Sequence, residues 1–188
     1  SVLDLGSMLG WDTLRNDIRN IGIVLQEQER AEQLLLQIKR RLEHAAIHVP
    51  AAERKTAMWL AVYGGKLAGG TVGSSRHHLL RFAGLRDIVA GTVDFGWPSY
   101  SVEEVLAYDP DYIVTGGGMS GGSMAEDIRA MPGLNQLRAV RENNIITMPK
   151  GTDDTGPGLV EAVEFLCDAV YGPPPAIERA LLPEEEKN

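Results

Sequence analysis

The chain has 188 residues, 44% of them hydrophobic, and a formal net charge of −8. That length suits one domain or slightly more, and that hydrophobic fraction is sufficient for a folded core. Charges of both signs are interspersed along most of the chain, which argues against the clustered basic surface that nucleic-acid binding requires. The single cysteine, Cys167, excludes an internal disulfide and a cysteine-based metal site.

The first 50 residues are predicted to be helical. From Trp11 to about Asn20, apolar residues recur at spacings of four and three, which indicates one apolar helix face, and Gly22 is expected to interrupt this helix. A longer amphipathic helix is predicted from about Glu27 to His44, and Pro50 stops it. The sequence shows no apolar run of about 18 residues and no signal peptide.

Strands and helices alternate after residue 50. The apolar run Thr56–Tyr63 is typical of a strand buried on both faces, and further strands are predicted at Asp111–Thr115 and Asn144–Met148. Helices are predicted at residues 74–82, 101–108, 123–131 and 157–171. The alternation predicts an α/β fold with an open, mainly parallel sheet and helices on both faces, preceded by the long helix. We therefore divide the chain into a helical segment (1–50), an α/β lobe (51–172) and a flexible tail (173–188).

Three loops should meet at the edge of the sheet where ligands bind in such folds, at residues 64–73, 116–122 and 148–156. The first two are rich in glycine, yet neither has Walker A spacing or the full dinucleotide fingerprint. Tight turns are therefore favoured over phosphate binding as the role of these glycines. Adjacent His77 and His78 would point about 100° apart on a helix, so no metal site is predicted there. No catalytic residue is predicted.

The segment from Gly96 to Asp111 is the most informative. Trp97 precedes Pro98 in a loop, so it is either a ligand-contact surface or an aromatic residue that plugs the domain's own core. Ser101 and Glu104 have the spacing of a capping box at the start of a helix. Glu103 lies in the first turn, where the helix dipole alone would favour an acidic residue.

These residues resemble the class III substrate-binding proteins of ABC importers, which carry cobalamin, haem or ferric siderophores. The family pattern has a tryptophan loop, a serine-started helix with an exposed glutamate, and Pro-Asp before a strand, matched here by Trp97, Ser101, Glu103 and Pro110-Asp111. The resemblance covers about residues 12 to 172. The sequence departs from the family pattern at Gly158, where many members have arginine. It also shows no lobe before the long helix, which complete members have. The resemblance therefore implies a fragment or a natural half-protein.

The resemblance implies a binding module rather than an enzyme, made of the C-terminal lobe and the interlobe helix, with no cofactor. Glu103 would dock to arginines of the membrane permease, and Trp97 would pack against a macrocycle or chelate. Weaker candidates for the pocket that binds this metal chelate are Tyr63, Lys66, Arg76 and Tyr100.

The location implied is periplasmic or otherwise extracytoplasmic, with a lipid anchor as an option in the full-length protein. If the first lobe is missing, the surface that faces it would be exposed, and we expect self-association through that surface. Two alternatives stay open. One is an α/β enzyme domain that binds a nucleotide or phosphorylated substrate through the glycine loops, and the other is an interaction module of the same fold that binds no ligand.

Overall fold

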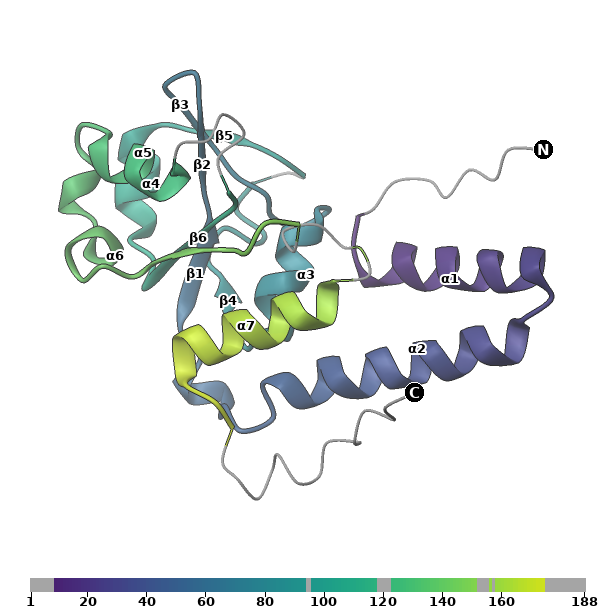
Figure 1. Cartoon of the computed structure of the whole chain (residues 1–188). Helices are drawn as coiled ribbons and strands as arrows, with labels where there is room; N and C mark the ends of the chain where they lie inside the picture. The colour runs from purple at the N-terminus through teal and green to yellow at the C-terminus, as the bar shows by residue number, and fades with distance from the viewer. Residues whose placement is uncertain (1–8, 94–95, 118–122, 152–155, 157, 175–188) are drawn as a thin grey trace.

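A helical hairpin opens the structure, which is a computed structural model describing residues 9–93, 96–117, 123–151, 156 and 158–174. Helices α1 (Trp11–Leu25) and α2 (Gln28–Ala45) run antiparallel and extend away from the rest of the molecule (Figure 1). An ion pair between Arg19 and Glu32, with Nε and Oε1 2.6 Å apart, links the two helices. The predicted long helix is thus confirmed as α2.

Gly22 does not interrupt the first helix, so that expectation was wrong. Helix α1 continues through Gly22 to Leu25 and ends where Gln26 adopts a left-handed conformation, with φ of 60°. Gly22 is buried against α2, and a Cβ atom built on it would lie 2.6 Å from Cβ of Ala31. The glycine therefore permits the close approach of two helices.

The main sheet is parallel, in the strand order β4-β1-β6-β7. Its strands are β1 (Thr56–Trp59), β4 (Arg86–Asp87), β6 (Tyr112–Thr115) and β7 (Ile145–Thr147). In the register of the sheet, Ile113 of β6 pairs with Met58 of β1 on one side and with Ile145 of β7 on the other. The strands predicted near residues 111–115 and 144–148 are confirmed, whereas β4 has only two residues and was not predicted.

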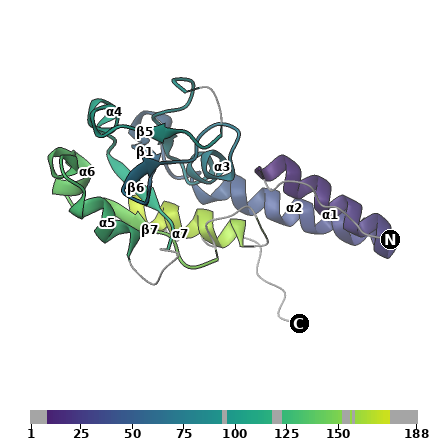
Figure 2. The same ribbon diagram turned by 90° about the horizontal axis from the view of Figure 1, so that it is seen from above.

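Helices cover both faces of this sheet, as the sequence predicted (Figures 1 and 2). Alternate residues of β1 explain why: Ala57 and Trp59 belong to one hydrophobic cluster, and Met58 belongs to the other. The first cluster packs against α2, α3 (Ser75–Phe82) and α7 (Leu159–Tyr171). The second packs against α4 (Val102–Tyr108), α5 (Met124–Ala130) and α6 (Arg138–Arg141). Single 3-10 turns lie at Ala51–Glu53 and Leu134–Gln136.

A second, antiparallel sheet was not predicted. It consists of β2 (Ala61–Tyr63), β3 (Lys66–Ala68) and β5 (Ser99–Tyr100), in the order β2-β3-β5. The predicted single strand Thr56–Tyr63 is therefore two strands that belong to different sheets. The N–H of Leu60, at the junction, still donates to the carbonyl of Val114 at 2.9 Å. Because both strands are apolar and nearly continuous, the break between them has no signal in the sequence.

The second half of α2 belongs to the core of the lobe. Leu42 is buried, and Arg41 forms a fork with both carboxylate oxygens of Glu164, at 2.7 and 3.0 Å. The Sγ of Cys167 in α7 lies 3.1 Å from the carbonyl of Ala45, and burial raises the pKa of this thiol to about 11. Cys167 thus behaves as the small buried residue that the sequence indicated.

Candidate ligand site at the sheet edge

Arg76 and Trp97 lie together where β1 ends. The guanidinium carbon of Arg76, in the first turn of α3, is 4.8 Å from the ring centroid of Trp59 and 5.6 Å from that of Trp97. Trp59 is the buried last residue of β1, whereas Trp97 is 41% exposed. A guanidinium in this position is attracted to the faces of both rings. The arrangement presents an exposed aromatic surface and a cation at the carboxyl edge of the parallel sheet.

The loop that carries Trp97 is held against the glycine-rich loop. Thr71 N–H donates to the carbonyl of Gly96 at 3.0 Å, and Gly69 N–H donates to that of Pro98 at 3.1 Å. A Cβ atom on Gly70 would lie 2.7 Å from side-chain atoms of Trp97, Arg76 and Ser74. The glycine is therefore explained by the close packing of Trp97, which supports the turn-and-packing interpretation of this loop over phosphate binding.

Tyr100 lies in the core. It is 7% exposed, and its ring meets that of Tyr108 edge to face, with centroids 6.4 Å apart. Its hydroxyl is buried without a hydrogen-bond partner among the described residues, and burial raises its pKa. Contact between Tyr100 and a ligand stays a prediction, and the exposed surface at this edge is supplied by Trp97.

Tyr63 and Lys66 lie on a hairpin away from Trp97. They face each other across the turn between β2 and β3, and both are exposed. The register of β3 with β5, extended by one residue, places Lys66 beside Ser101 at the start of α4. Trp97 is four residues from Ser101, or ~13 Å along an extended strand. The structure thus brings Arg76 and Trp97 together and separates Tyr63 and Lys66 from them.

Glu103 lies at the exposed start of α4. The predicted capping box is confirmed: Ser101 Oγ accepts from the N–H of Glu104 at 3.1 Å, and the Glu104 carboxylate accepts from the N–H of Ser101 at 2.7 Å. That backbone hydrogen bond lowers the pKa of Glu104. Glu103 is exposed and forms no ion pair with any described residue, so its carboxylate is presented to solvent.

A buried polar cluster that the sequence did not reveal fixes α3. The side chain of Asp87, 1% exposed, accepts from Thr71 Oγ1 at 2.8 Å and lies 2.8 Å from Nδ1 of His77. The N–H of Val89 also donates to it at 3.2 Å. This cluster joins α3 to the glycine-rich loop and to β4, and so helps to position Arg76. A strand as short as β4 has no periodicity from which to predict Asp87 as a buried residue.

Some expectations fall outside the described residues. Residues 118–122 and 152–155, including most of the second glycine loop, lie there.

In the described part, no three His, Cys, Asp or Glu side chains are close enough together to hold a metal ion. Nor is any helix of that part both long enough and apolar enough to cross a membrane.

A mainly parallel sheet covered by helices on both faces, with a long helix attached, is a fold that this chain shares with solute-binding proteins. The chain belongs to the periplasmic binding protein family, whose model matches residues 3–152. This match confirms the family resemblance seen in the sequence. The family comprises binding proteins for transport and is not a family of enzymes.

Solved structures with the same fold include an ABC transporter substrate-binding protein from Listeria monocytogenes EGD-e, with TM-score 0.77 and 16% identity over 87% of this chain and 66% of that one. The periplasmic heme-binding protein RhuT from Roseiflexus sp. RS-1 has TM-score 0.74 and 20% identity over 86% of this chain and 63% of that one. A periplasmic heme-binding protein from Pseudomonas aeruginosa has TM-score 0.71 and 24% identity over 89% of this chain and 60% of that one. The chain thus spans between 60 and 66% of the length of these proteins. No curated protein matches it in sequence.

Proposed function

We propose that the chain is the C-terminal lobe, with its interlobe helix, of the substrate-binding component of an ABC importer for a haem, siderophore or cobalamin-type chelate. The observation that carries the proposal is the exposed Trp97 beside the guanidinium of Arg76 at the sheet edge. An aromatic face suits a flat macrocycle or the organic part of a chelate. A guanidinium suits carboxylate groups carried by such a ligand. Heme is also what the Roseiflexus and Pseudomonas proteins are named for binding.

Docking to the permease is assigned to Glu103. Its carboxylate is exposed, it stands in the first turn of a capped helix, and the chain as a whole is acidic. An exposed carboxylate of this kind steers and orients a basic partner more than it adds affinity. Tyr63 and Lys66 lie on the neighbouring hairpin, so we assign them to the rim of this docking surface. They also remain weaker candidates for contact with the ligand.

Family membership implies an extracytoplasmic location for the protein. We propose that the location is the periplasm or its equivalent, and that a lipid anchor in the full-length protein is compatible with docking to a membrane permease. A test is fractionation of cells that express the full-length gene, with detergent release as the sign of an anchor.

Self-association is proposed through the outer end of the helical hairpin. Large apolar side chains are exposed there, from 36% for Ile21 to 64% for Leu25. Others on the hairpin are Val24, Leu34 and Leu36. Clustered exposed apolar residues mark contact surfaces. Sedimentation velocity of the isolated chain should show a concentration-dependent increase in mass, which substitution of Leu25 by Lys should reduce, and a monomer at all concentrations would refute this proposal.

The ligand is tested by titrating the chain with haem, cobalamin and a ferric siderophore, and following the absorbance of each ligand. We expect saturable binding of one of them, weakened roughly tenfold or more by Trp97→Ala, because an anchoring aromatic side chain is commonly worth over 1 kcal/mol at an interface. Trp11→Phe is the matched control, since it alters a tryptophan in α1. Equal affinities for the two variants would refute the site, and binding of none of the three would favour the ligand-free interaction module.

A further inference from the structure

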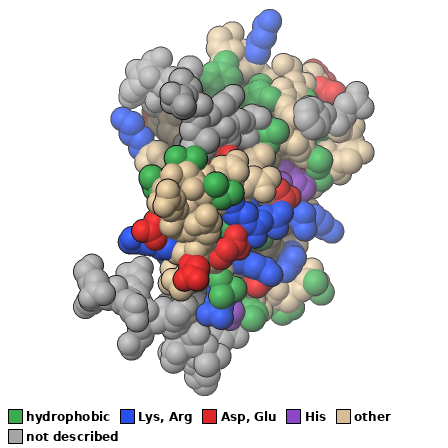
Figure 3. All heavy atoms as spheres, turned by 90° about the vertical axis from the view of Figure 1, so that its right-hand side faces the viewer, with side chains coloured by type: hydrophobic (Ala, Val, Ile, Leu, Met, Phe, Trp, Pro, Cys, Tyr) green, Lys and Arg blue, Asp and Glu red, His purple; other side chains and the backbone are tan. Residues whose placement is uncertain are grey.

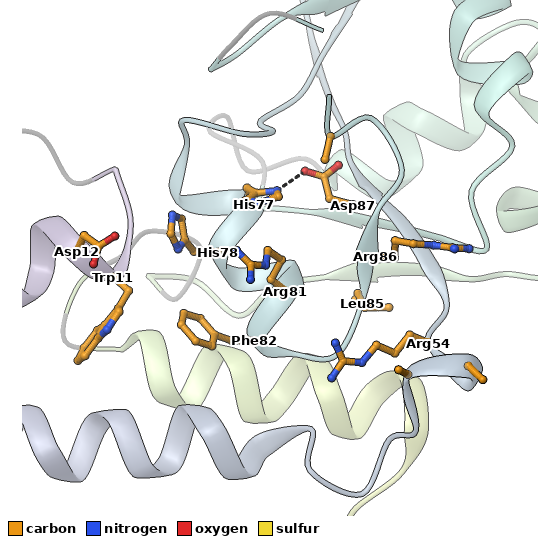
Figure 4. A pocket seen from close by; sticks show the side chains of 13 residues that line it. Trp11, Asp12, Arg54, His77, His78, Arg81, Phe82, Leu85, Arg86 and Asp87 are labelled. Atoms are coloured by element: carbon orange, nitrogen blue, oxygen red, sulfur yellow. Dashed lines mark hydrogen bonds and ion pairs between the residues drawn. The ribbon is translucent and has the colours of Figure 1, made fainter. Parts of the chain in front are cut away.

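A second cavity, of about 730 Å³, lies along β4, the edge strand of the main sheet (Figure 4). His77, His78 and Arg81 reach it from α3, and Asp12 comes from the start of α1. Arg54 precedes β1, and Arg86 is the first residue of β4. None of these residues belongs to the Trp97 site. In Figure 4, the side chain of Arg54 reaches the space below Leu85, Arg81 lies beside His77 and His78, and Arg86 extends away from both.

The carboxylates of the cavity are already engaged. Asp87 is bonded by Thr71, His77 and the N–H of Val89, and its side chain is 1% exposed. Asp12 forms an ion pair with Arg15 at 3.1 Å. Neither carboxylate forms an ion pair with Arg54, Arg81 or Arg86.

The three guanidiniums of the cavity, on Arg54, Arg81 and Arg86, form no ion pair with any carboxylate in the described part of the chain. Other arginines do so: Arg41 is bonded by two glutamates, and Arg138 lies 3.0 Å from Asp111. In a chain with a net charge of −8, a cavity lined by three exposed arginines that have no ion pair in the described part is a local exception. Figure 3 shows basic side chains in a band on the face at the hairpin end, with acidic side chains and a histidine next to them.

His78 lies beside Arg81 in the lining of this cavity. Its ring packs against that of Phe82 and against the turn before α1. Burial lowers its pKa, and His77 and Arg81 lower it further, while Asp12 acts in the opposite direction. Burial and the neighbouring His77 and Arg81 together therefore favour the neutral imidazole.

We propose that this cavity binds a compact oxyanion with at least two negative charges, of the kind represented by inorganic phosphate or a small polycarboxylate. A guanidinium presents two parallel N–H groups that match the oxygens of either class, so Arg54 and Arg81 would hold the anion. A ring N–H of His78 would donate to the anion, and protonation of the imidazole would strengthen this contact. This site is independent of the proposed chelate site.

The test is an NMR titration of the imidazole signals with phosphate and separately with citrate, at constant ionic strength set with sodium chloride. The chain has 4 histidines, and His78→Gln assigns the signal of interest. We expect saturable shifts with a dissociation constant of roughly 1 mM or below and an upward shift of the His78 pKa when the anion is bound. Whichever of the two anions binds more tightly identifies the source, phosphate or carboxylate.

Matched arginine variants decide the outcome. Arg81→Gln and Arg54→Gln should each weaken binding about tenfold, because each removes a charge-assisted contact. Arg30→Gln, at the exposed start of α2, should leave it unchanged, as should Trp97→Ala, which separates this site from the chelate site. Arg54 lies outside the helices, so its variant stays informative if Arg81→Gln perturbs α3. Absence of saturable shifts, or an equal effect of Arg30→Gln, would overturn the proposal.

Discussion

The contact between Gly22 and Ala31 provides the sharpest test of how the helical hairpin is built. Replacing Gly22 by Ala places a new Cβ atom 2.6 Å from Cβ of Ala31, about 1 Å closer than two carbon atoms normally pack. The helix propensity of alanine favours the substitution by about 1 kcal/mol. Overpacking opposes it by about 1–3 kcal/mol, so we expect a net loss of up to about 2 kcal/mol in the free energy of unfolding.

A double-mutant cycle separates the two contributions. Ala31→Gly alone should cost about 1 kcal/mol through propensity. The double variant Gly22→Ala with Ala31→Gly moves the methyl group from one helix to the other and should unfold with nearly the wild-type free energy, because the steric conflict is gone. Urea unfolding followed by circular dichroism at a helical wavelength measures all four proteins. If the double variant loses the sum of the two single effects to within about 0.5 kcal/mol, the close contact is not what requires glycine.

Three further changes test the packing of the lobe. Although burial opposes it, hydrogen bonds from Thr56 hold the pKa of Asp111 below its ordinary 3.8. The stability that Asp111 contributes is therefore complete above about pH 4 and is lost as the pH falls through the lowered pKa. Urea unfolding at several pH values should show that the stability of Asp111→Asn depends less on acid pH, and an unchanged dependence would contradict this. Ser101→Ala should cost about 1 kcal/mol in the free energy of urea unfolding by removing the cap of α4, and a cost near zero would show that the cap is dispensable. Tyr171→Phe should cost about 1 kcal/mol in the same assay, because its hydroxyl bonds two backbone groups at 2.8 and 2.9 Å, whereas the exposed Tyr63→Phe serves as a control with no expected change.

Local signals in the sequence predicted the parts of the fold that depend on neighbouring residues. The capping box of Ser101 and Glu104 can be predicted from a span of four residues. The two hairpin helices show apolar positions with helical periodicity. The strand β6 was predicted because its apolar run is bounded by Asp111 and by glycines. These signals were sufficient for the α/β class and for the resemblance to the family.

The remaining parts depend on contacts between distant residues. Strands of two or three residues, such as β3 and β5, are too short to show periodicity, so the antiparallel sheet was missed. Gly22 looked like a helix breaker because the sequence does not show that Ala31 packs against it. At the site, Trp97 was singled out by its place next to Pro98, whereas the stacking of Arg76 on Trp59 joins a helix to a strand and has no local signature.

The six residues that lead from Trp97 to Glu103 have a mechanical consequence. They contain β5, which is bonded to β3, and the capped start of α4, so there is little slack between them. The loop at one end is tied to the glycine-rich loop by backbone hydrogen bonds. The proposed ligand contact at Trp97 and the proposed docking residue Glu103 are therefore joined by a short, hydrogen-bonded segment and not by a free loop.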